Sequence, residues 1–329
     1  MNCNCVVVSG YYYTGSSAVV DLLKEYNGAY EPRAEFRLIK DPYGLIDLRY
    51  NLVERWDPLN SDNSIKDFLW LTNHLNAQNS LLSLTYGYGY SSEEVFGKRF
   101  MEETVEFVNR ITDFKYEGSW FFTQFKQTKA ERIKEKALKL CRVNPKHYMF
   151  FSNCSANEFD EYASIYLENI FGLNEHKNDS FAIIDQGLPA QNPDYINNFF
   201  KNAKMIIVDR DPRDVYVDML DEGVQLIGDT LKKTHDTSVF IKWYKSYHKN
   251  QKNLCDNVIR VNFEDVVLNY KKTVDLIEGF LDLDSKNHIR PNTCLLPEVS
   301  KNNIGRYKNI LTKKEINELQ ELKDFFWEN

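Results

Sequence analysis

The residues best suited to chemistry form a glycine-containing stretch near the N-terminus. It consists of Gly10, Tyr11, Tyr12, Tyr13, Thr14, Gly15, Ser16 and Ser17. Two glycines five residues apart, followed by serines, are the frame of a phosphate-binding loop, although Ser16 stands where such a loop usually has lysine. The N–H groups at a helix N-terminus bind anions without a lysine, and the hydroxyl side chains add donors. The stretch therefore predicts a phosphate site.

Arg210 is the second candidate for a phosphate contact. It follows an apolar run at residues 204–208, and a strand there would bring Arg210 to the carboxyl edge of a parallel sheet, where ligands bind. A guanidinium can hold a phosphate through two hydrogen bonds. The alternative is that Arg210 pairs with a neighbouring carboxylate, Asp209, Asp211 or Asp214. A third basic stretch, residues 300–309, holds Lys301 and Arg306 and is also compatible with a basic surface loop.

The elements that must position these residues alternate between strands and helices. Buried strands are expected at residues 5–9, 180–185, 204–208 and 258–261, with a further strand at 34–39. Helices are expected at residues 16–26, 192–200, 212–220 and 271–281. This alternation predicts an α/β fold with a mostly parallel central sheet that helices cover on both faces.

The middle of the chain has a different character. Residues 68–84, 93–110, 129–141 and 158–171 have helical spacing, and aromatic residues crowd 86–90 and 120–122. We therefore expect one domain, residues 1–329, in which residues 56–175 form a helical insert. Such an insert can act as a cap with an aromatic acceptor pocket, although most of these rings can equally belong to a core.

Composition excludes several classes of function. The net charge of −7 argues against general binding of nucleic acid or anionic lipid. There is no apolar run long enough to cross a membrane and no secretory signal, so we expect no integral membrane contact. Six scattered cysteines indicate reduced thiols in a cytoplasmic protein. Cys3 and Cys5 lack a second pair at zinc spacing, so no metal site is expected. The oligomeric state is not indicated.

Taken together, three stretches resemble the nucleotide signatures of the P-loop sulfotransferase superfamily. They are "SGYYYTGSS" after the first strand, "VDRDPRDVYV" late in the chain, and "KNNIGRYKN" near the C-terminus. Residues 261–284 also resemble the acidic strand-to-helix segment of that family. The resemblance implies transfer of a sulfuryl group from 3′-phosphoadenosine 5′-phosphosulfate (PAPS), which leaves PAP. The acceptor would be a hydroxyl or amine of a small molecule, with a carbohydrate as the first candidate.

The resemblance also implies roles for individual residues. Residues 10–17 would hold the 5′-phosphate and sulfate end of PAPS, and Arg210 the 3′-phosphate. Lys301 and Arg306 would lie near the 3′-phosphate and the adenine, where Tyr307 takes the place of a family tryptophan.

Asp185, at the end of an expected strand, is our candidate for the general base that accepts the proton of the acceptor. It can alternatively cap the following turn. Glu35, Asp41 and His147 are the other candidate bases.

Two positions depart from the family pattern. Tyr13 stands where the family has a lysine or arginine beside the leaving oxygen, so Tyr13 is the catalytic candidate there unless Arg33, Arg37 or Lys40 supplies a charge.

Asp218 replaces a serine that binds the 3′-phosphate. It would repel that phosphate unless it turns away or pairs with Arg213 or Lys232; if it faces the site, the donor lacks a 3′-phosphate.

Two other functions stay open: a P-loop kinase that uses ATP and Mg²⁺, and a non-catalytic nucleotide-binding relative.

Overall fold

The computed structural model describes residues 4–31, 35–76, 99–143, 146–173, 180–222, 226–249 and 255–328. The chain divides into two compact units. One consists of Met1–Arg37 with Phe171–Asn329, and the other of Leu38–Ile170. The prediction of a single domain with an insert at residues 56–175 stays a prediction.

The first unit is built on a parallel sheet of five described strands in the order β2-β5-β1-β6-β7. The strands are β1 (Cys5–Gly10), β2 (Ala29–Tyr30), β5 (Phe181–Asp185), β6 (Ala203–Asp209) and β7 (Val258–Asn262). After β1, the chain forms β2 and β5 on one side of β1 and then crosses to form β6 and β7 on its other side. The carboxyl end of β1 is therefore a switch point, where ligands of such sheets bind. The predicted α/β fold is confirmed.

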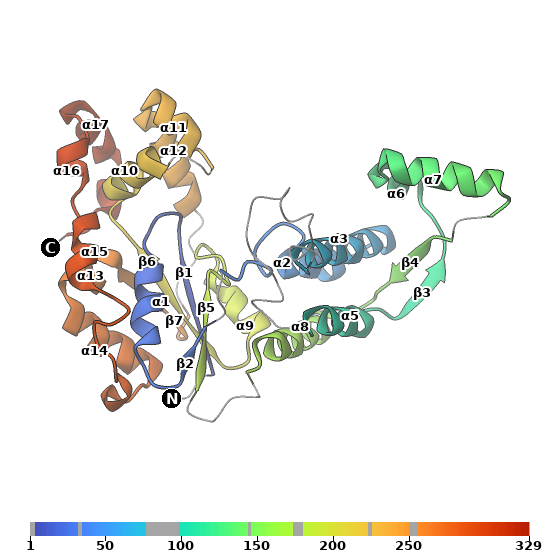
Figure 1. Ribbon diagram of the computed structural model, residues 1–329, viewed down its shortest axis with the longest axis horizontal. Coiled ribbons are helices and arrows are strands. Elements are labelled where there is room, and N and C mark those ends of the chain that lie inside the picture. The colour runs from blue at the N-terminus through green and yellow to red at the C-terminus, as the bar shows by residue number, and fades with distance from the viewer. Residues whose placement is uncertain are drawn as a thin grey trace. The chain divides into compact units, whose positions relative to one another are not determined.

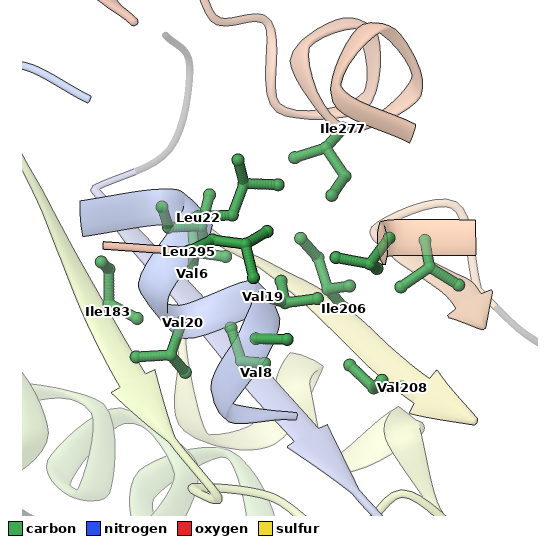
Figure 2. Packing of buried hydrophobic residues seen from close by; sticks show 14 of the residues in the cluster. Val6, Val8, Val19, Val20, Leu22, Ile183, Ile206, Val208, Ile277 and Leu295 are labelled. Atoms are coloured by element: carbon green, nitrogen blue, oxygen red, sulfur yellow. The ribbon is translucent and has the colours of Figure 1, made fainter. Parts of the chain in front are cut away.

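The central strands of the sheet are buried on both faces, because most of their residues are apolar. Val6 and Val8 of β1 pack against helix α1 (Ser17–Lys24), whose Val19 and Leu22 face them (Figure 2). The intervening residue, Val7, points to the opposite face and is fully buried as well. Burial of such a side chain stabilises the fold by roughly 1.5–3 kcal/mol. This core fixes the loop that joins β1 to α1.

The other helices of this unit surround the sheet and its carboxyl edge (Figure 1). They are α9 (Ile196–Phe199), α10 (Pro212–Glu222), α11 (Gly228–Thr234), α12 (Thr237–His248), α13 (Phe263–Leu268), α14 (Tyr270–Leu281), α15 (Pro297–Ser300), α16 (Tyr307–Ile310) and α17 (Lys313–Glu318). Side chains of α10, α11, α12 and the C-terminal segment share a second core.

The prediction of a strand at residues 34–39 is wrong. Residues 38–40 form a turn, and Ala34 lies outside the described residues. The apolar residues of this stretch, Phe36, Leu38 and Ile39, are nevertheless buried. The backbone carbonyls of Leu38 and Ile39, however, accept hydrogen bonds from the first amides of helix α2 (Leu45–Arg49). Strand β2 forms earlier in the chain instead.

The second unit contains helices and a short antiparallel sheet. Its helices are α2, α3 (Pro58–Asn76), α5 (Phe100–Arg110), α6 (Phe121–Lys126), α7 (Lys129–Leu140) and α8 (Ala156–Phe171). Parts of the helices expected at residues 68–84 and 93–110, and the aromatic run at 86–90, lie outside the described residues. The sheet pairs β3 (Phe114–Glu117) with β4 (Tyr148–Phe151) and was not predicted. Among the described residues, no helix has the length and apolarity to cross a bilayer.

Candidate functional site

The loop between β1 and α1 needs both of its glycines. A Cβ on Gly10 would lie 2.2 Å from Thr14 Oγ1, and a Cβ on Gly15 would lie 2.6 Å from the ring of Phe263. Gly15 also has a φ of +75°, in the left-handed region that favours glycine. The Thr14 hydroxyl donates to the carbonyl of Tyr11 at 2.9 Å and closes the loop. The glycine spacing therefore sets a compact loop against the start of α13 (Phe263–Leu268).

Three consecutive amides at the start of α1 are available to a ligand. Within the part of the chain that the structure describes, the N–H groups of Gly15, Ser16 and Ser17 make no hydrogen bond. Together with the positive end of the helix dipole, such amides bind phosphate or sulfate. The Ser16 hydroxyl accepts a hydrogen bond from Gln186 Nε2 at 2.8 Å, which ties the loop to the end of β5.

Arg210 lies directly beside this loop. Gly10 and Val208 are register partners in adjacent parallel strands, so the two strand ends are at the same edge of the sheet. Arg210 Nη1 donates to the Tyr13 carbonyl at 2.9 Å, and Nη2 donates to the Asn303 carbonyl at 2.8 Å. Tyr13 has a φ of +61°, a strained conformation for a non-glycine residue. Arg210 therefore joins the N-terminal loop to the C-terminal segment.

The carboxylate of Asp218 bridges two arginines. Arg210 Nη1 contacts Asp218 Oδ2 at 2.5 Å, and Arg306 Nη1 contacts Oδ1. The Arg210 side chain is 4% exposed and that of Asp218 is 16% exposed. Asp218 therefore faces the site, and neither Arg213 nor Lys232 is its partner. Arg306 also pairs with Asp221.

The carboxylates that the sequence offered as partners of Arg210 pair elsewhere. Asp211 forms an ion pair with Arg213, and Asp209 pairs with Arg260.

Asp214 holds the third basic stretch in place. Its buried carboxylate accepts from the amides of Gly305 at 2.6 Å and Tyr307 at 3.0 Å. The Arg213 guanidinium lies over the Tyr307 ring, 4.1 Å from its centroid. Lys301, by contrast, is an exposed side chain that pairs with Glu298. The structure thus brings Arg306 to Asp218, the partner of Arg210, and leaves Lys301 at the surface.

Asp185 ends β5 and is the register partner of Val8 in β1, so it lies at the same edge of the sheet as the loop. Its backbone carbonyl accepts from the amide of Phe36 at 2.8 Å. The next residue, Gln186, has a φ of +57° and makes the contact to Ser16. Gln186 was not anticipated, because no sequence signal marks a glutamine as a loop contact.

The three loop tyrosines are held by side chains that sequence reasoning missed. The centroids of the Tyr11 and His248 rings lie 4.0 Å apart with the ring planes tilted by 35°, and Arg260 Nη2 donates to the Tyr11 hydroxyl at 3.2 Å. The Tyr12 ring lies 6.2 Å from that of Trp243. Aromatic residues at positions 240, 243, 244, 247 and 248 repeat at helical spacing along α12, and this stripe was the available signal.

The hydroxyl of Tyr13 is engaged at the end of α10. Burial raises the pKa of Tyr13, and the charge and hydrogen bond of Glu222 raise it further. Tyr13 therefore remains a neutral hydrogen-bond donor at ordinary pH.

Among the candidate cations, Arg37 has an electrostatic effect on Tyr247. Burial raises the pKa of Tyr247 to about 12, and the positive charge of Arg37 acts in the opposite direction. The Tyr247 ring packs against that of Tyr12. Arg33 lies outside the described residues, and Lys40 belongs to the other unit.

Two of the other candidate bases are paired on the surface. Glu35 lies 3.8 Å from Arg37, and His147 lies 3.3 Å from Glu135 in the second unit. Asp41 also belongs to the second unit.

One buried acid lies behind Arg210. Glu264 is 1% exposed, and its Oε1 accepts from the amide of Asp211 at 2.9 Å. Its Oε2 has no hydrogen-bond partner among the described residues. Burial raises the pKa of Glu264 from 4.5 to about 7, although the hydrogen bond and the Arg210 charge act in the opposite direction.

Three solved structures are similar to this chain. The sulfotransferase domain of the olefin synthase of Synechococcus PCC 7002 is 12% identical, with a TM-score of 0.43, over 99% of this chain and 95% of that domain. The sulfotransferase domain of the curacin biosynthetic pathway is 12% identical, with a TM-score of 0.43, over 98% and 99%. Sulfotransferase STF9 from Mycobacterium avium is 12% identical, with a TM-score of 0.39, over 99% and 77%.

No curated protein matches the chain. Residues 95–287, more than half of the chain, match the family described as "Sulfotransferase family". The matched range includes Asp185, Arg210 and Asp218 and excludes the loop at residues 10–17. The chain therefore belongs to the sulfotransferase family, a family of transferases.

Proposed function

We propose that this protein transfers a sulfuryl group from a nucleotide phosphosulfate to a hydroxyl or amine of a small acceptor, with a carbohydrate as the first candidate. PAPS is the donor that the family resemblance implies. Membership in the family favours this reaction over phosphoryl transfer from ATP.

The observation that carries the proposal is the set of unbonded amides at residues 15–17. They follow the carboxyl end of β1, at the edge of the sheet where β5 ends at Asp185 and β6 ends just before Arg210. A phosphosulfate carries its charge on non-bridging oxygens, and such amides are the donors that suit those oxygens. The contact between Gln186 and Ser16 holds the amides in place, so little reorganisation is needed when charge develops on the leaving phosphate.

We assign to Asp185 the role of general base toward the acceptor. In the proposed reaction, the acceptor oxygen or nitrogen bonds to sulfur while the bond from sulfur to the bridging oxygen breaks. The acceptor proton passes to the Asp185 carboxylate, and the electron pair of the broken bond stays on the phosphate. Tyr13 can donate to that phosphate only if its hydroxyl leaves Glu222.

The proposed acceptor cap, residues 56–175, is supported by its exposed rings. Trp56, Trp70, Trp120 and Phe121 are between 39% and 57% exposed in the second unit. Exposed aromatic faces bind the apolar faces of sugars and other flat acceptors. This assignment is part of the proposal.

The residues around the loop and Arg210 fit only part of PAPS. The loop suits the 5′-phosphosulfate end. The position between Arg210 and Arg306 does not suit a 3′-phosphate, because the Asp218 carboxylate already lies between these two guanidinium groups.

The test is transfer of labelled sulfate from adenosine 5′-phosphosulfate and from PAPS to a panel of sugars, phenols and amines, with EDTA present. We expect transfer by the wild-type protein and a loss of roughly 10²-fold or more in kcat for Asp185→Asn. Asp275→Asn removes an exposed carboxylate on α14 and is the matched control. Full activity of Asp185→Asn would remove Asp185 from the mechanism. Transfer of phosphate from ATP that requires Mg²⁺, without transfer of sulfate, would refute the proposed function.

A further inference from the structure

We propose that Asp218 determines the form of the donor, so that the site takes an adenosine 5′-phosphosulfate with a free 3′-hydroxyl and discriminates against a 3′-phosphate. The inference rests on the proposed function, since it concerns the same nucleotide site. It follows from three features of the described residues around Arg210.

The first feature is geometric. The two oxygens of the Asp218 carboxylate each accept from a different guanidinium, Arg210 at 2.5 Å and Arg306. Two arginines that converge on a pair of oxygens are the arrangement that holds a phosphate in proteins. Here the chain itself supplies the anion, so the position for a second phosphate is taken by a side chain.

The second feature is the balance of charge. Arg210 and Arg306 carry two positive charges, and their partners Asp218 and Asp221 carry two negative charges. Arg210 also donates to the carbonyls of Tyr13 and Asn303, and its guanidinium lies 5.0 Å from the centroid of the Phe263 ring, so none of its other contacts among the described residues is with an anion. A 3′-phosphate would therefore bring its negative charge to a cluster that is already neutral, and it would lie beside a carboxylate.

The third feature is that Asp218 is fixed. Its neighbours on α10, Val217 and Met219, are 0% and 1% exposed in the second core, so the helix cannot turn without exposing them. Rotation of the side chain alone would break both of its ion pairs. Loss of one partner of a buried ion pair is strongly unfavourable.

A carboxylate at this position suits a ribose hydroxyl. An ionised carboxylate only accepts hydrogen bonds, and a hydroxyl can donate one. In dinucleotide sites the same choice is known: an acidic side chain accepts from an unmodified ribose hydroxyl, and an arginine accommodates the phosphorylated form. Asp218 would act in the first way toward the 3′-hydroxyl.

The experiment is calorimetric titration of the full chain with AMP and with adenosine 3′,5′-bisphosphate. The wild-type protein should bind AMP at least 10-fold more tightly than the bisphosphate. Asp218→Ser should reverse the order, with a gain of at least 100-fold for the bisphosphate relative to AMP, and Asp218→Asn should change it in the same direction. Asp160→Asn is the matched control, because Asp160 forms a similarly buried bidentate pair with Arg49 in the other unit.

The outcomes separate the two proposals. Tighter binding of the bisphosphate than of AMP by the wild-type protein would overturn the inference and leave the proposed function intact. Binding of neither nucleotide by the wild-type protein or the two Asp218 variants would contradict the nucleotide site itself. An equal change of preference in Asp160→Asn would show that loss of an ion pair, and not the position of Asp218, caused the effect. As a second readout, the wild-type protein should transfer sulfate from adenosine 5′-phosphosulfate at least 10-fold faster than from PAPS.

Discussion

Replacement of Glu264 by glutamine should stabilise the protein above neutral pH and have little effect in acid. Glu264 is fully buried behind Arg210, and burial raises its pKa from 4.5 to about 7. Between these two values the folded protein binds more protons than the unfolded chain. The free energy of unfolding therefore falls as the pH rises through this window, because folding must then bury a charged carboxylate.

The size of the effect follows from the shift in pKa. Each unit corresponds to about 1.4 kcal/mol, so the full cost of ionising Glu264 in the folded state is about 3 kcal/mol. At about pH 5 most of this cost is absent, and it is nearly complete at about pH 8. Glutamine keeps the shape of the protonated acid and can accept from the Asp211 amide, so Glu264→Gln should gain about 2–3 kcal/mol relative to wild type between these pH values.

The assay is urea unfolding at a series of pH values. Glu321→Gln removes an exposed glutamate and is the matched control for the substitution itself. If the difference in stability between Glu264→Gln and wild type were the same at about pH 5 and pH 8, Glu264 would not be the buried acid that we describe.

Two further substitutions test the loop and its support. Gly15→Ala should destabilise the protein by about 1–3 kcal/mol and abolish AMP binding, because the new Cβ would meet Phe263 and the backbone there is left-handed. Gly279→Ala, within α14 and with no atom within 4 Å of the new Cβ, should instead stabilise the protein by about 0.5–1 kcal/mol. Equal shifts of the melting temperature in the two variants would contradict this reasoning. Asp214→Asn should lower the free energy of unfolding by about 1–2 kcal/mol and speed hydrogen exchange at residues 305–307, because one backbone amide loses the carboxylate oxygen to which it donates. Unchanged exchange at these residues would show that the contact with Asp214 does not hold the segment.

The sheet was predictable because its strands are short apolar runs bounded by polar residues. Residues 5–9 and 205–208 are buried on both faces of a parallel sheet, and Val258 and Val261 are buried in the neighbouring strand, so these runs carry the signal without reference to the rest of the chain. The helix after Arg210 was predictable for a similar reason, since Pro212 suits the first turn of a helix.

The failures have physical causes as well. Residues 34–39 show the alternation of a strand, but the carbonyls of Leu38 and Ile39 are used by the start of α2, a partner that local sequence does not reveal. Strands β3 and β4 are four residues each and depend on one another across a gap of about thirty residues.

The site was predictable only in part. Its loop and Arg210 are local signals at the ends of strands. The bridge from Arg210 through Asp218 to Arg306 joins residues that are eight and 88 positions apart. An ion pair of this kind depends on tertiary packing, so the sequence could name Asp218 as a departure but could not identify its partners.

The most direct test of the nucleotide site is to follow the backbone amide resonances of Gly15, Ser16 and Ser17 by NMR while AMP is added. If these amides hold the 5′-phosphate, their resonances should show the largest and saturable shifts in the chain, and the shifts should be lost in Gly15→Ala. Saturable shifts confined to other residues, with these three amides unchanged, would contradict the central claim.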